Sequence, residues 1–229
     1  MFIPLYDGVP LRYLKGAWVN WALVGLNVAA YAALAAGLLG AMSRIDLEFG
    51  AIPAVLTGAA HLEAGLLHIN PRWTILTGMF LHASWLHLIG NMLFLWVFGD
   101  NVEDAMGRLR FLLFYLLCGA GATALYTFMQ PGSEEPLIGA SGAISGVVAA
   151  YLILYPRVHV WGLVFQVLPL SIPAWLCVGG WVALQIGSAF FGGAPEVGWW
   201  AHVGGILTGA ALTPLLKRRE VALFSRQTG

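Results

Sequence analysis

The feature that most constrains this chain is a series of six long apolar stretches. They cover Trp18–Met42, Trp85–Gly99, Phe111–Met129, Ser141–Tyr155, Leu168–Phe191 and Trp199–Leu216. Hydrophobic residues make up 59% of the chain and charged residues only 10%, whereas a soluble domain has about 45–50% and about 25%. An apolar helix of about 20 residues crosses the hydrocarbon core of a bilayer. The sequence therefore predicts an all-α, polytopic membrane protein with six transmembrane helices.

The length of 229 residues is consistent with one membrane domain, residues 1–229. Its helical core is expected at about residues 18–216, because six spans of roughly 20 residues use about half of the chain. The connection from Ser43 to Ser84 is long and carries acidic residues and prolines. We expect it to be an outer interfacial loop with short helices. No cleavable signal peptide is expected, since the first apolar run is too long for one.

The basic residues indicate how the helices are oriented. Nine of the eleven lysines and arginines fall on one side of a six-span topology, and only Arg44 and Arg72 fall on the other. The positive-inside rule makes the richer side cytoplasmic. Both termini are then cytoplasmic, and the protein is a multi-pass protein of the plasma or inner membrane if the organism is bacterial. The formal net charge is zero, so no overall field favours binding to nucleic acid.

Polar side chains at membrane depth are functional candidates, because they are costly to place in lipid. The candidates are His82, His87, Asn91, Ser141, Ser145 and His202. Ser141, His202 and His87 lie 16, 15 and 13 residues from the charged residue at the cytoplasmic end of their helices. These separations correspond to about 24, 22 and 20 Å of helix. In a core of about 30 Å, a potential nucleophile and two imidazoles thus share one level near the outer surface.

Glycines should let two of these helices approach closely. Gly142 and Gly146 form one G-x-x-x-G pattern, and Gly205 and Gly209 form another. Such patterns bring helix backbones together in lipid. His202 precedes the second pair by three and seven residues, so all three share one helix face. Generic packing would explain either pattern alone, but the matched depth of serine and histidine favours a functional contact.

These residue types fit acyl-transfer chemistry. A serine hydroxyl becomes a strong nucleophile when a neighbouring neutral histidine takes its proton, and the resulting oxyanion needs hydrogen-bond donors. His87 and Asn91 are four residues apart on one helix, so both side chains point to the same side. With the Ser141 backbone N–H they could supply these donors. The alternative is a polar pair that only holds helices together.

Other polar residues are expected to have structural roles. Glu103 and Asp104 should pair with Arg108 and Arg110 at the cytoplasmic turn, and His82 should brace the outer loop. No metal site is expected, because the chain has no H-E-x-x-H motif and the histidines at 82 and 87 lie on diverging helix faces.

Four motifs resemble the rhomboid family of intramembrane serine proteases. They are FLHASWLHLIGNM (Phe80–Met92), GDNVEDAMG (Gly99–Gly107), GASGAISG (Gly139–Gly146) and AHVGGILTG (Ala201–Gly209). They occur in the order found in that family, and the resemblance covers the whole six-helix core. It implies a rhomboid-like bundle with a long first outer loop.

The resemblance also implies roles for individual residues. Ser141 would be the nucleophile and His202 the base, forming a dyad without an acid, a cofactor or a metal. His87 and Asn91 would line the oxyanion hole. Small residues would pack the helices around the dyad: Gly139, Gly142, Gly146, Gly205 and Gly209. The substrates would be membrane proteins with a transmembrane helix, cleaved near the outer face of the membrane.

Two positions depart from the family pattern. Members often carry an aromatic residue four positions after the serine, stacked on the catalytic imidazole, where this chain has Ser145. A tryptophan–arginine pair in the first loop occurs here in reversed order, as Arg72–Trp73. Neither departure removes a catalytic group; they concern the orientation of the His202 ring and the anchoring of the first loop.

Two other functions compete with proteolysis. A non-catalytic rhomboid-like protein would bind transmembrane clients, but such relatives lack the serine or the histidine, and this chain retains both. A transporter is expected to carry charged or broken-helix sites near the midplane, and no acidic residue lies within the predicted spans. For a protease, the run Leu168–Phe191 is the candidate gate for a substrate helix, because its prolines and glycines predict weak packing.

Overall fold

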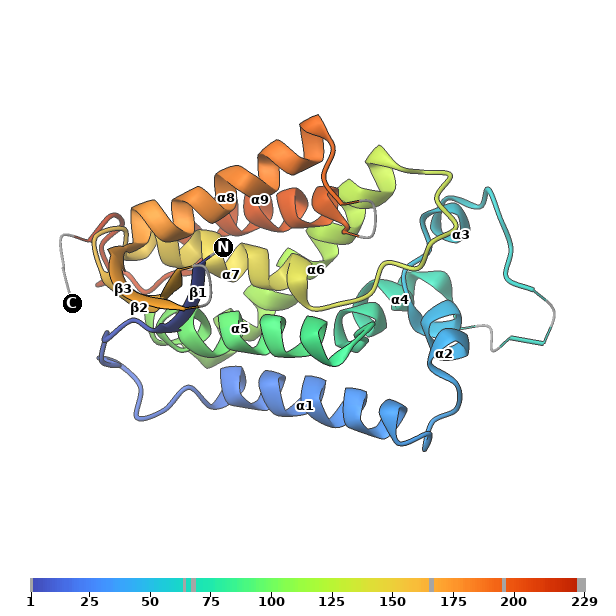
Figure 1. Ribbon diagram of the computed structural model, residues 1–229, viewed down its shortest axis with the longest axis horizontal. Coiled ribbons are helices and arrows are strands. Elements are labelled where there is room, and N and C mark those ends of the chain that lie inside the picture. Colours follow the sequence, from blue (N-terminus) through green and yellow to red (C-terminus); the bar gives the residue numbers. More distant parts are fainter. Residues whose placement is uncertain (1, 64, 67–68, 165–166, 195–196, 226–229) are drawn as a thin grey trace.

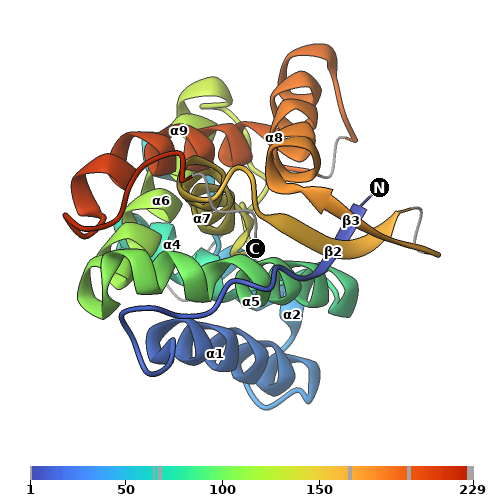
Figure 2. The same cartoon turned by 90° about the vertical axis from the view of Figure 1, so that its left-hand side faces the viewer.

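The computed structural model describes residues 2–63, 65–66, 69–164, 167–194 and 197–225, and most of them form helices. Six helices make up one bundle (Figure 1): α1 (Trp18–Ala35), α5 (Trp85–Met106), α6 (Arg108–Met129), α7 (Ser141–Leu154), α8 (Ala174–Phe191) and α9 (Trp199–Leu216). Helix α7 lies in the centre and packs against α5, α6, α8 and α9, while α1 packs on the outer side of α5 (Figure 2). The central position of α7 surrounds its first residue, Ser141, with other helices.

Short helices connect α1 to α5 at one end of the bundle, which we call the loop end. They are α2 (Met42–Phe49), α3 (Pro53–Thr57), α4 (Pro71–Thr77) and the 3-10 helix η1 (Gly78–Phe80). The α4–η1 segment meets α5 at a bend of 83°. Arg72 and Trp73 are both exposed at the start of α4, and Trp73 is 61% exposed. The loop end therefore has its own helical structure, set crosswise to the bundle.

A three-stranded antiparallel sheet lies at the opposite end, which we call the sheet end (Figure 1). Its strands are β1 (Phe2–Tyr6), β2 (His159–Val164) and β3 (Leu168–Pro173), in the order β1-β2-β3. The sequence did not predict this sheet, and placing Leu168–Pro173 in the fifth span was wrong. Pro169 and Pro173 lack the N–H that a helix interior needs, so the chain stays extended until α8 begins at Ala174.

The helices differ in how well each fits a bilayer. Among the described residues, α1, α6 and α8 are long and apolar enough to cross a membrane, and the bent pair of α4–η1 with α5 would make a fourth span. Helix α7 is apolar but has only 14 residues, or about 21 Å. A mostly helical membrane protein is thus confirmed, whereas the number of six spans stays a prediction.

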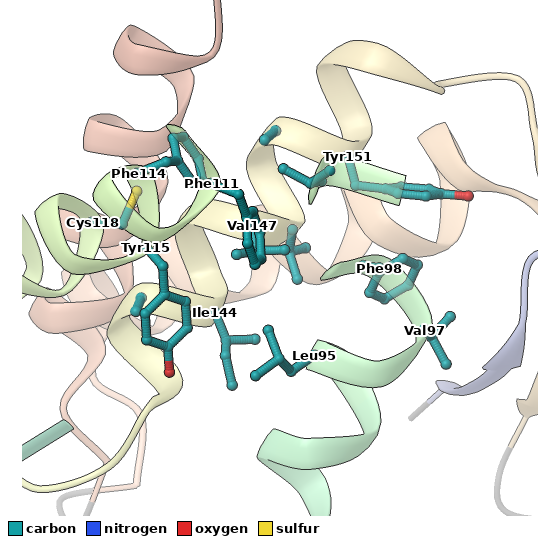
Figure 3. Close-up of a cluster of buried hydrophobic side chains, with 14 of the residues drawn as sticks. Leu95, Val97, Phe98, Phe111, Phe114, Tyr115, Cys118, Ile144, Val147 and Tyr151 are labelled. Atoms are coloured by element: carbon teal, nitrogen blue, oxygen red, sulfur yellow. The ribbon is translucent and has the colours of Figure 1, made fainter. Parts of the chain in front are cut away.

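The core of the bundle lies between α5, α6 and α7 (Figure 3). Six large side chains there are at most 1% exposed: Leu95, Phe98, Phe111, Tyr115, Val147 and Tyr151. By contrast, Leu109 on the outer surface is 80% exposed. Apolar residues therefore cover the inside and the outside of the bundle, as expected where lipid replaces water.

Helix α5 continues to Met106, seven residues beyond the predicted end at Gly99. Its Glu103 carboxylate accepts the backbone N–H groups of Val19 at 3.2 Å and Asn20 at 2.7 Å. The first N–H groups of a helix have no acceptor within that helix, and the N-cap residue of α1 provides no side-chain hydrogen bond. Glu103 of α5 therefore caps α1.

Asp104 has a similar role for the segment before α1. Its two carboxylate oxygens accept the backbone N–H groups of Arg12, Tyr13 and Leu14 at 2.7–2.9 Å. The prediction that Glu103 and Asp104 form ion pairs with Arg108 and Arg110 is corrected: among the described residues no salt bridge joins them, and both carboxylates bind backbone amides instead. Backbone N–H groups that are removed from water need an acceptor, and the two carboxylates supply it for both segments at the sheet end.

Asp7 links the N-terminal segment to the bundle as well. Its Oδ2 accepts hydrogen bonds from Asn101 Nδ2 and the Tyr151 hydroxyl, both at 2.8 Å, and its Oδ1 accepts the Val9 N–H. Asp7 is 6% exposed. Burial raises the pKa of this carboxyl group, and the hydrogen bond from Tyr151 partly opposes the shift.

Candidate functional site

Ser141 and His202 meet at the loop end of the bundle. Ser141 is the first residue of α7, and His202 lies in the first turn of α9. The distance between Ser141 Oγ and His202 Nε2 is 3.0 Å. His202 is 9% exposed. This is hydrogen-bonding distance, and it allows the imidazole to take the hydroxyl proton.

Glycines explain why α7 and α9 approach so closely. A Cβ atom on Gly209 would lie 2.5 Å from the Gly146 Cα, and a Cβ on Gly205 would run into the Gly142 carbonyl oxygen. A Cβ on Gly146 would in turn lie 3.0 Å from the Gly205 oxygen. The two backbones thus touch where both helices lack side chains. His202 shares this face of α9 and is held beside the first turn of α7.

Gly139 shapes the approach to α7. Its φ of +117° lies in a region that favours glycine, and its N–H donates to the Gly78 oxygen of η1 at 2.9 Å. A Cβ atom at this position would lie 2.7 Å from His87 Cε1, 2.9 Å from His87 Nε2 and 3.7 Å from Asn91 Nδ2. The loop before Ser141 therefore rests directly on the two side chains of α5.

One cavity of about 860 Å³ joins these groups. His87, Asn91, Ser141 and His202 all line it. The other lining residues include apolar ones from the bundle and polar ones from the loop end: Phe94, Ile144, Trp181, Gln130, Ser133 and Glu135. The four predicted site residues are therefore brought together, from three helices, around a single space large enough for an extended peptide.

Asn91 is 8% exposed, and its Nδ2 donates no hydrogen bond to the protein within the described residues. A buried amide donor normally has an acceptor. The Asn91 side chain lines the same cavity as Ser141. Asn91 thus holds a buried donor without an acceptor among the described residues, in the wall of the cavity that Ser141 also lines.

Trp199 packs beside His202, whereas Ser145, at the position of the family's usual aromatic residue, bonds to α7 itself. Ser145 is fully buried, and its hydroxyl donates to the Ser141 carbonyl oxygen at 2.7 Å. The Trp199 ring lies 5.9 Å from the His202 ring in an edge-to-face arrangement. The sequence analysis missed Trp199, although its position three residues before His202 puts both on one side of α9.

His82 lies behind the site. It is fully buried, with its ring 5.1 Å from that of His87 and 6.5 Å from that of Tyr31 on α1. His82 therefore joins the segment between η1 and α5 to α1, which agrees with a bracing role at the loop end. Among the residues that the structure describes, no group of three or more His, Cys, Asp or Glu side chains could hold a metal ion.

Comparison with known proteins agrees with this geometry. The family model of the Rhomboid domain matches residues 70–219, which is more than half of the chain and includes all four motifs. The chain belongs to the rhomboid family. Members of this family are generally intramembrane serine proteases. This membership agrees with the helical membrane character of the chain and with its four motifs.

Several curated relatives carry rhomboid names. Rhomboid-like protein 11, chloroplastic, of Arabidopsis thaliana is 31% identical over 158 residues, covering 67% of this chain and 56% of that protein. RHOMBOID-like protein 6, mitochondrial, of the same plant is 32% identical over 143 residues, covering 62% and 43%. Rhomboid protein 1, mitochondrial, of Saccharomyces cerevisiae is 29% identical over 152 residues, covering 62% and 41%. The chain thus spans about half the length of these rhomboid relatives.

Proposed function

We propose that this rhomboid is an intramembrane serine endopeptidase that uses Ser141 as nucleophile and His202 as general base. The observation that carries the proposal is the 3.0 Å distance between Ser141 Oγ and His202 Nε2 inside the 860 Å³ cavity. A serine at hydrogen-bonding distance from a histidine, with further donors close by, is the arrangement that nucleophilic acyl transfer requires.

The reaction follows from the positions of these groups. Ser141 Oγ attacks the carbonyl carbon of the scissile bond while His202 Nε2 takes the hydroxyl proton. The oxyanion is stabilised by His87, Asn91 and the Ser141 N–H, which heads α7 and has no acceptor within that helix. His202 then gives its proton to the leaving amine. Water, activated by the same imidazole, hydrolyses the acyl-enzyme and restores Ser141.

The proposed membrane placement has six spans in one domain, residues 1–229, with both termini cytoplasmic. The sheet end then faces the cytoplasm and the loop end faces outward. From His202 to the end of α9 at Leu216 is about 21 Å of helix. In a hydrocarbon core of about 30 Å, the dyad lies below the outer surface. The scissile bond of a transmembrane substrate would be near that surface.

A substrate helix is proposed to enter laterally between α5 and α8. Phe94 of α5 and Trp181 of α8 line the cavity on this side, with ring centroids 5.5 Å apart. Only 17% of the residues of α8 are buried, against 39% in an 18-residue stretch of α6. Gly180 has no neighbouring atom within 4 Å of where a Cβ would lie. Helix α8 is therefore the least tightly held of these spans and the proposed gate, although its two preceding prolines lie in β3.

Covalent labelling tests the nucleophile without a known substrate. The detergent-solubilised protein is incubated with a fluorophosphonate, and the labelled residue is identified by mass spectrometry. We expect labelling at Ser141 that is lost in Ser141→Ala and His202→Ala and kept in Ser145→Ala, the matched serine one turn further along α7. Labelling of Ser145 in the Ser141→Ala variant would show that the wrong serine has been assigned.

Cleavage of a reporter transmembrane substrate in vesicles tests the oxyanion hole. Removing one oxyanion donor costs about 10²–10³ in turnover in soluble proteases, so His87→Ala and Asn91→Ala should each show a loss of that order. Wild-type rates in both variants would mean that the two residues only hold helices together.

The alternative function is binding of transmembrane clients without cleavage. It is favoured by the relatives that are named only rhomboid-like. Wild-type protein that binds the reporter helix as tightly as Ser141→Ala, and never cuts it, would support this function over proteolysis.

A further inference from the structure

The hairpin formed by β2 and β3 exposes more apolar surface than a cytoplasmic loop normally carries. The sequence has no Asp, Glu, Lys or Arg from residue 158 to residue 195. Within the hairpin, Trp161 is 53%, Leu168 51% and Leu170 40% exposed, and Val167 at its tip is 79% exposed. A projecting apolar hairpin in water would promote aggregation. Its surroundings in the native protein must therefore be apolar on at least one side.

The register of the sheet separates two kinds of face. Val160 is fully buried against the core, and the face that it belongs to is aliphatic over both strands. Beyond the bundle this face consists of Val164, Leu168, Leu170 and Ile172. The opposite face carries Trp161, the cross-strand Ser171, and Tyr6 of β1, which pairs with Trp161, and toward the hairpin tip also Leu163 and Pro169. The purely aliphatic face, with Val160, is thus turned toward the helices, and the opposite face is the one that bears the indole of Trp161 and the hydroxyl groups of Ser171 and Tyr6.

The hairpin lies at the level where α8 begins. Strand β3 ends at Pro173, and α8 starts at the next residue. The 18 residues of α8 extend about 27 Å, close to the thickness of a hydrocarbon core of about 30 Å. Figure 2 shows the hairpin projecting past the bundle between α8 and α5. Its level is therefore the boundary between acyl chains and headgroups.

The exposed surface of the hairpin continues onto the lipid-facing side of α8. Trp175 and Leu176, in the first turn of α8, are 58% and 52% exposed. Tryptophan and tyrosine favour the membrane interface because their rings combine an apolar body with a polar group. Pairing with a strand of another protein is disfavoured at the free edge of β3, because Pro169 and Pro173 have no N–H to donate.

We propose that the β2–β3 hairpin is a lipid-binding element that lies flat in the interface of the leaflet at the sheet end. Its aliphatic face contacts acyl chains, and Trp161 and Tyr6 face the headgroups. The hairpin thereby fixes the depth of the adjoining end of α8, while the other end of α8 stays free to move beside the cavity. This inference rests on the membrane placement given under Proposed function.

Fluorescence quenching in vesicles tests the position of the hairpin. A nitrobenzoxadiazole label is attached to Val167→Cys in a Cys177→Ala background, since the remaining thiol, Cys118, is fully buried. The vesicles contain phosphatidylcholine and phosphatidylglycerol brominated either near the headgroup or near the methyl end of the acyl chains, and iodide is the aqueous quencher. Glu220→Cys, an exposed site beyond α9, is the matched control, and Leu184→Cys at mid-α8, 62% exposed, reports whether that helix spans the bilayer.

We expect the Val167 label to be quenched most by bromine near the headgroup and to lose most of the iodide quenching seen at Glu220. Iodide quenching equal to that at Glu220 would overturn the proposal, and so would stronger quenching by the deep bromine. Protection from iodide without quenching by either lipid would mean that a protein covers the hairpin. Because no readout requires proteolysis, an inactive enzyme would still give the expected result. A Leu184 label that deep bromine fails to quench would instead refute the membrane placement.

Discussion

Replacing Gly139 by alanine perturbs the proposed oxyanion hole while Ser141, His202 and His87 themselves are kept. The added Cβ would lie 2.7 Å from His87 Cε1, and ordinary contact begins at 3.4 Å. The His87 ring must then shift by about 0.7 Å, and a misplacement of about 1 Å at an active site can cost about 10²-fold in rate. Scaled to this shift, we expect a loss of about 10- to 100-fold in kcat/KM.

The backbone adds a separate effect on stability. Gly139 has a φ of +117°, and holding a residue with a side chain in such a conformation costs about 1–3 kcal/mol. Thermal unfolding in detergent measures this part, and cleavage of the reporter substrate below the unfolding midpoint measures the other. Gly132→Ala is the matched control, because it lies in the same loop with open space around its Cβ position. It should change neither quantity.

A double-mutant cycle decides whether the lost activity passes through His87. If Gly139→Ala acts by displacing that ring, it should cost little further activity in a His87→Ala background, because both changes remove the same interaction. Losses that multiply in the double variant would refute this reasoning. A Gly139→Ala variant that retains the wild-type kcat/KM would also refute it.

Three further predictions concern packing and the sheet end. Gly209→Ala should lower the stability of the protein by about 1–3 kcal/mol and slow fluorophosphonate labelling, because the added methyl group separates α7 from α9. Gly180→Ala, which has open space around its Cβ position, should do neither. Equal labelling rates in the two variants would contradict this prediction. Asp104→Ala should destabilise the protein by about 1–3 kcal/mol, since three backbone N–H groups lose their acceptor. The control is Glu220→Ala at an exposed site, and an equally high thermal unfolding midpoint in both variants would argue against the anchoring role of Asp104. Burial raises the pKa of Asp7 in the folded state, so folding takes up a proton between the two pKa values. The stability of the protein should therefore fall as the pH rises from the ordinary carboxyl pKa through the raised one. Asp7→Asn should remove this part of the pH dependence of unfolding, and an unchanged pH profile would exclude Asp7 as its source.

Much of the helical architecture follows from the hydrophobic pattern alone. Helix α9 spans Trp199–Leu216, as the apolar run predicts, and α1 and α7 begin at the predicted Trp18 and Ser141. Apolar runs mark helices clearly where lipid is the solvent, because every backbone amide must be paired within the segment. The end of α5 was not predictable in this way. Its acidic residues look like a loop by polarity, yet they stay helical while binding amides about 80–90 residues away in sequence.

The depth of the candidate site residues in the membrane was predictable from the sequence, but the contacts between them were not. Counting residues along each helix placed Ser141 and His202 at the same level, which gives only one of three coordinates. The 3.0 Å distance between them depends on the close approach of α7 and α9, which the glycine patterns suggested without requiring. Trp199 was missed because the family pattern directs attention to α7, whereas the ring contact with His202 comes from α9 itself.

The capping of α1 by Glu103 has a consequence for the order in which the chain assembles. The amides of Val19 and Asn20 leave the ribosome more than 80 residues before the carboxylate that accepts them. Until α5 has been synthesised, the start of α1 has to keep these amides hydrated or paired with lipid headgroups. Stable docking of the first helix is therefore a late event in biogenesis, and it waits for the same helix that brings His87 and Asn91 to the site.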